Sequence, residues 1–62
     1  MAALIQSPNL PDNDGFYAEL LVAHEGLSEA ESAALNARLV LILANHVGDR
    51  EALSEALALA RD

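Results

Sequence analysis

Apolar residues in the middle of this chain recur with the spacing of a helix. Over residues 29–47, Leu35, Leu39 and Ile42 follow one another at intervals of three and four, which places them on one face of a helix. The uninterrupted apolar run 39–44 makes the middle of that helix apolar on every side. A helix of this kind is normally buried. The pattern therefore predicts a central helix whose leucine face covers the rest of the same chain.

Capping residues indicate where the predicted helices begin and end. Ser28 and Glu31 have the spacing of a capping box, and Gly48 is suited to the left-handed conformation that ends a helix. Asp12 and Asp49 are preferred N-cap residues. No useful stretch alternates with a period of two, so the sequence predicts an all-α fold, a helical hairpin with a short third helix. The predicted helices cover residues 13–25, 29–47 and 50–61, in one domain over 12–62 that follows an N-terminal tail of residues 1–11.

The small residues of the central helix predict a contact with a second molecule. Ala33, Ala37 and Ala44 form a stripe nearly opposite the leucine face, and small side chains let another helix approach closely. Leu41 lies beside this stripe with no obvious cover within 62 residues. A chain of this size is marginally stable alone, and without cysteine it has no disulfides. We therefore expect a dimeric bundle, a homodimer through helix 29–47, with a larger enzyme as the alternative partner.

The charge of the chain excludes several classes of partner. The net charge is −7, and the only cations are three arginines. A nucleic-acid-binding protein needs several side chains that neutralise phosphates, so no nucleic-acid partner is expected. Anionic membrane surfaces are disfavoured for the same reason, and the longest apolar run is far shorter than the roughly 20 residues that cross a membrane. No basic residue precedes the apolar N-terminal residues, which predicts an acidic cytoplasmic protein rather than a secreted one.

A few polar side chains are candidates for an interface or a ligand site. Arg38 and Asn45 are seven residues apart on one face of the central helix, where they either fix the register of a helical interface or contact a ligand. His24 and His46 each stand two residues before a glycine that ends a helix, which favours a capping role. With Tyr17 these four could instead line a cleft between helices. No nucleophile–base pair, metal-ligand spacing or cofactor loop is present, so the sequence predicts no enzyme, no cofactor and no metal.

Several segments resemble a family of short bacterial proteins catalogued as a domain of unknown function. The most specific of them are Leu35-Asn36-Ala37-Arg38-Leu39 and Ala44-Asn45-His46-Val47-Gly48-Asp49, supported by Phe16-Tyr17, Ala23-His24 and Gly26-Leu27-Ser28. The resemblance covers about residues 8–61 and implies a small all-helical bacterial protein, without catalytic residues to carry over. It also implies an association with flavin-dependent oxygenases of aromatic-compound breakdown. The sequence thus predicts a non-catalytic interaction or accessory protein, with a small-molecule or effector-binding bundle as the alternative.

Overall fold

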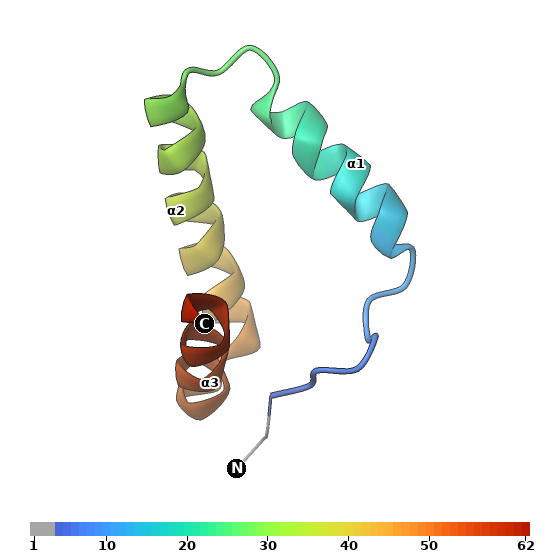
Figure 1. Ribbon diagram of the computed structural model, residues 1–62, viewed down its shortest axis with the longest axis vertical. Helices are drawn as coiled ribbons and strands as arrows, with labels where there is room; N and C mark the ends of the chain where they lie inside the picture. Colours follow the sequence, from blue (N-terminus) through green and yellow to red (C-terminus); the bar gives the residue numbers. More distant parts are fainter. Residues whose placement is uncertain (1–3) are drawn as a thin grey trace.

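Three helices make up the chain in the computed structural model, which describes residues 4–62 (Figure 1). Helix α1 spans Asn13–His24, α2 spans Glu29–Val47 and α3 spans Arg50–Arg61. Residues 4–62 contain no strand, so the predicted all-α class is confirmed. Residues 1–3 of the predicted N-terminal tail lie outside the described residues.

Local hydrogen bonds define both ends of α2. The Ser28 backbone N–H donates to Glu31 Oε1 at 2.9 Å, and the Glu31 N–H donates to Ser28 Oγ at 3.2 Å. These two bonds are the capping box that the sequence indicates, and they satisfy two N–H groups that have no partner inside the helix. At the other end, Gly48 adopts φ 65° and its N–H donates to the carbonyl oxygen of Ala44 at 3.0 Å. Glycine takes this left-handed conformation without steric cost, so the helix ends there.

The N-termini of α1 and α3 depend on aspartates. Asp49 Oδ1 accepts the N–H groups of Glu51 at 3.0 Å and Ala52 at 3.1 Å. Asp12 Oδ1 accepts the Gly15 N–H at 3.2 Å, and Asp12 itself has a left-handed backbone with φ 53°. A Cβ atom on Gly15 would overlap the Asp12 carboxylate. The missing side chain at Gly15 therefore leaves the space that this cap occupies.

The helices form an open arrangement rather than a closed bundle. In Figure 1, α1 and α2 diverge from the turn at 25–28 like the arms of a V, and α3 reverses direction after α2. The segment 4–11 runs from the start of α1 toward α3, where the Leu4 N–H donates to Glu55 Oε2 at 2.9 Å (Figure 1). The corner between α2 and α3 contains Ala52, the one buried apolar residue among residues 4–62. Apolar side chains elsewhere in the described chain are therefore half-buried or exposed.

The leucine face of α2 is only partly covered, which contradicts the expectation that it covers the rest of the chain. Leu35 and Leu39 are half-buried, but Ile42 is 65% exposed and Leu43 47% exposed. The physical reason is the divergence of the first two helices. Because α1 leaves α2 at the turn, it covers only the first half of the face that a parallel-sided hairpin would cover along its full length.

Candidate interaction surface

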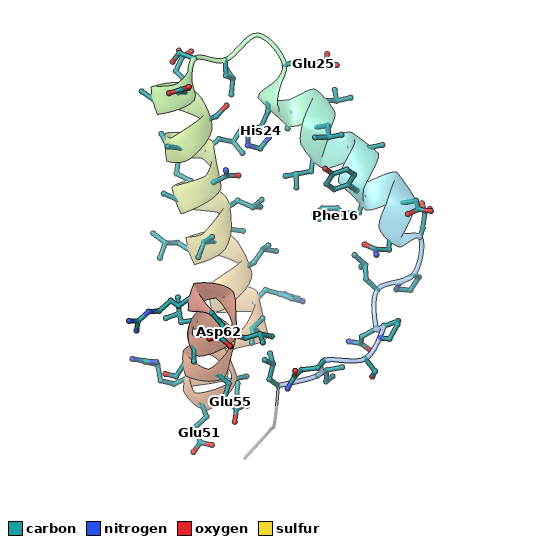
Figure 2. All side chains as sticks on the ribbon, viewed as in Figure 1. Phe16, His24, Glu25, Glu51, Glu55 and Asp62 are labelled. Carbon is teal, nitrogen blue, oxygen red and sulfur yellow. The ribbon has the colours of Figure 1, made fainter. Side chains whose placement is uncertain are left out.

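One side-chain hydrogen bond joins α1 to α2. His24 lies half-buried in the last turn of α1 and points toward α2 (Figure 2). Its Nδ1 is 2.8 Å from the carbonyl oxygen of Leu20, and its Nε2 is 3.0 Å from Oδ1 of Asn36. Within residues 4–62 no other side-chain hydrogen bond joins these two helices. The structure therefore gives His24 an interhelical role, and it adds Asn36, which the sequence does not single out as a site residue.

The five predicted polar residues do not gather in one cleft. At 100° per residue, Arg38 and Asn45 lie about 20° apart on α2, whereas Asn36, which contacts His24, lies on nearly the opposite side. His46 is exposed, and Tyr17 is 60% exposed on α1. A shallow depression at the end of α3 contains none of these five residues; its lining is Ala58, Arg61 and Asp62. Their positions supply no enclosed ligand site.

The two most exposed of the large apolar side chains in residues 4–62 belong to the second half of α2. Leu41 is 72% exposed, Ile42 65% and Val40 59%. Of the three predicted interface alanines, Ala33 and Ala37 are exposed, whereas Ala44 is half-buried within its own chain. The small-residue stripe is therefore open over its first part only. Leu41 is the most exposed large apolar residue of the described chain.

Helix α1 adds a second uncovered apolar area. Phe16 lies on the side of α1 that faces α2 (Figure 2), yet it remains 42% exposed because the helices diverge there. Tyr17, Leu21 and Val22 are each more than half exposed. Leu20, one turn from His24, is half-buried. The apolar face of α1 thus covers α2 only near the turn.

Carboxylates are absent from the exposed part of α2. The ten acidic residues of the chain all lie outside residues 32–48, where Arg38 is the only arginine, lysine or acidic residue. The labelled carboxylates in Figure 2 belong to the turn and to α3: Glu25, Glu51, Glu55 and Asp62. A stretch of 17 residues with exposed apolar side chains and no negative charge is suited to contact with another apolar surface.

The total exposed area is too large for a folded monomer of this size. The chain exposes 5438 Å², whereas a folded protein of 6.5 kDa exposes about 3,800 Å². It buries only about 40% of its unfolded surface, against about 60% for a domain of 60 residues. The radius of gyration is 13.3 Å, compared with about 10.6 Å for a compact domain of this length. Roughly 1,600 Å² of surface therefore lacks the cover that a folded chain normally has.

Other kinds of site have no support in the described residues. Residues 4–62 contain no group of three or more His, Cys, Asp or Glu side chains that could hold a metal ion. Within the same part of the chain, no helix combines the length and the hydropathy that a membrane span requires. The chemical property that distinguishes this surface is therefore its exposed apolar area.

Comparison with known protein families finds a match over the part of the chain that the structure describes. Residues 4–62 match the model of a family described as "Protein of unknown function (DUF2783)". Neither the curated proteins nor the solved structures include a chain that matches this one. The match covers every residue that the structure describes, including both sides of α2 and the contact between His24 and Asn36.

Proposed function

Because the chain belongs to the family of unknown function DUF2783, we propose its function from its surface: it is a non-catalytic interaction protein that acts as a homodimer formed through α2. The observation that carries this proposal is the lack of cover over α2. Leu41, Ile42 and Val40 are each more than half exposed. The whole chain exposes roughly 1,600 Å² more than a folded monomer of the same mass. Burial of such an area in a complex supplies the stability that a single chain lacks.

The size of the uncovered area favours a stable complex. If each copy buries half of this area, about 800 Å², the interface totals about 1,600 Å², which is the standard size of a specific, stable interface. Homodimer interfaces are also more apolar than transient ones, which agrees with the exposed Leu41, Ile42 and Val40 of α2. The carboxylate-free segment 32–48 suits this role, because two copies that each carry a charge of −7 can meet there without direct contact between carboxylates.

An accessory role belongs to the same proposal. A homodimer formed through α2 leaves Phe16 and Tyr17 on α1 and Leu57 on α3 exposed, and these residues would contact a larger protein. The resemblance of the sequence directs this role toward flavin-dependent oxygenases of aromatic-compound breakdown, in the cytoplasm. The contact with an oxygenase is a prediction from the resemblance alone, whereas the dimer is a prediction from the exposed surface of α2.

Sedimentation equilibrium tests the homodimer. At micromolar concentration we expect a mass of twice 6.5 kDa, with no monomer of comparable abundance. The melting temperature should rise with protein concentration, because association stabilises only the folded chain. A monomer that keeps its helical content at these concentrations, with a melting temperature independent of concentration, would show that the proposal is wrong. Purification with a suspected oxygenase then tests the accessory role separately.

A further inference from the structure

We propose that two copies of α2 pack antiparallel about a two-fold axis near Leu41, so that Arg38 of each copy donates a hydrogen bond to the amide oxygen of Asn45 of the other. This inference rests on the proposed homodimer and specifies its contact surface, orientation and register. Three features of the single chain carry it: the side of α2 left uncovered, the absence of partners for two polar side chains, and the distribution of charge.

The covered side of α2 identifies the free side. Ser32, Leu35 and Leu39 are half-buried by their own chain, and Asn36 is engaged by His24. At 100° per residue, these positions occupy one half of the helix circumference, and Leu41 lies near the middle of the other half. Its exposure of 72% agrees with that placement. A second copy therefore meets α2 on the Leu41 side without displacing α1.

Small side chains on this free side allow a close approach. Ala34 and Ala37 precede Leu41 at intervals of seven and four residues, which keeps them on the contact side of the helix. Both alanines are exposed. Because the distance between packed helices depends on the side chains at the contact, the alanines let Leu41 of the second copy reach the surface of the first.

The two polar residues beside Leu41 determine the orientation. Within residues 4–62, neither the Arg38 nor the Asn45 side chain has a hydrogen bond or an ion pair. In a parallel two-fold pair the two Arg38 side chains would lie on opposite flanks of the contact, each level with Ala37 of the other copy and without a side-chain acceptor. In an antiparallel pair centred near Leu41, Arg38 is level with Asn45 of the second copy. The guanidinium then donates to an amide oxygen, and the two-fold axis forms this pair twice.

The charge distribution supports this partner over an unrelated acidic or basic surface. Residues 32–48 carry no carboxylate, so two copies in this arrangement bring apolar residues and one arginine each into contact. An acidic partner would meet Arg38 alone among many apolar side chains, and a basic partner would meet no carboxylate on this segment. A self-complementary surface of this kind is what a two-fold interface requires.

Cysteine cross-linking tests the geometry, because the chain has no cysteine of its own. The samples are the single variants Leu41→Cys, Arg38→Cys and Asn45→Cys. Each is oxidised alone, and Arg38→Cys and Asn45→Cys are also mixed and oxidised together. A disulfide needs Cα atoms within about 7 Å. We expect rapid cross-linking of Leu41→Cys with itself and of Arg38→Cys with Asn45→Cys. In an antiparallel pair the two positions 38 are about 10.5 Å apart along the axis, so Arg38→Cys alone should cross-link slowly.

Leu57→Cys is the matched control, since Leu57 is 61% exposed but lies on α3. It should cross-link no faster than collisions between dimers allow. Equal rates for Leu41→Cys and Leu57→Cys in a protein that sediments as a dimer would overturn this surface and leave the homodimer standing. Faster cross-linking of Arg38→Cys with itself than with Asn45→Cys would overturn the antiparallel register. Sedimentation as a monomer would refute the homodimer itself. Far-UV circular dichroism confirms that each variant keeps its helices.

Discussion

Replacement of Leu41 by alanine should weaken association far more than it weakens the single chain. Leu41 is 72% exposed, so its own chain covers little of it and truncation costs an isolated chain less than about 1 kcal/mol. In the dimer the same side chain is buried, and loss of a buried leucine costs at least about 2 kcal/mol per site. The difference is at least about 1 kcal/mol per site and about 2 kcal/mol per dimer, which corresponds to a rise in Kd of at least about thirtyfold.

The measurement is a dilution series followed by sedimentation velocity, with Leu57→Ala as the control. Both leucines are similarly exposed in the single chain, at 72% and 61%, so a purely intrachain effect would be similar for the two variants. We expect Leu41→Ala to dissociate at a far higher concentration than the parent, and Leu57→Ala to dissociate close to it. An equal Kd for the two variants, or a lower melting temperature for Leu41→Ala without a change in Kd, would refute the reasoning.

Three further predictions concern the fold and use the free energy of unfolding at one fixed protein concentration. In a double-mutant cycle, His24→Ala and Asn36→Ala should show a coupling free energy of about 0.5–1.5 kcal/mol, which is the net contribution of one hydrogen bond to stability. If the effects of the two substitutions simply add, the contact between the two helices is not formed in solution. Gly15→Ala should leave the free energy of unfolding almost unchanged, because the new Cβ displaces the Asp12 cap, and the loss of that cap, about 1 kcal/mol, offsets the better helix propensity of alanine. A stabilisation of about 1 kcal/mol would contradict this account. Gly48→Ala should destabilise by about 1 kcal/mol, since alanine is strained at φ 65°, and an unchanged melting temperature would argue against the left-handed end of α2.

Features that depend on a few consecutive residues could be predicted from the sequence. The capping box of Ser28 and Glu31 acts across three residues, so its residue types alone indicate where α2 begins. The conformation at Gly48 depends on the absence of a side chain at that position. The all-α class could also be predicted, because the spacing of the apolar residues is local along each helix.

The packing of the helices could not be predicted in this way. The sequence predicts that the leucine face covers its own chain, but Ile42 stays 65% exposed because the turn at 25–28 directs α1 away from α2. The hydrogen bond between His24 and Asn36 spans twelve residues and depends on the same direction. Histidine at a helix end is well explained by capping alone, so no local signal points to its partner on the next helix.

The exposed surface and the charge pattern have one physical explanation in common. Electrostatic repulsion keeps copies of an acidic chain apart, yet this chain leaves Leu41 and Ile42 of α2 exposed. Both properties are compatible if association is confined to one surface, since the ten carboxylates all lie outside residues 32–48 and disfavour contacts between copies where they stand. Arg38 and Asn45 then select one orientation on that surface, because only an antiparallel pair brings each arginine level with the amide oxygen of Asn45 in the other copy. The polar residues of α2 would thus contribute specificity, and its apolar residues the affinity.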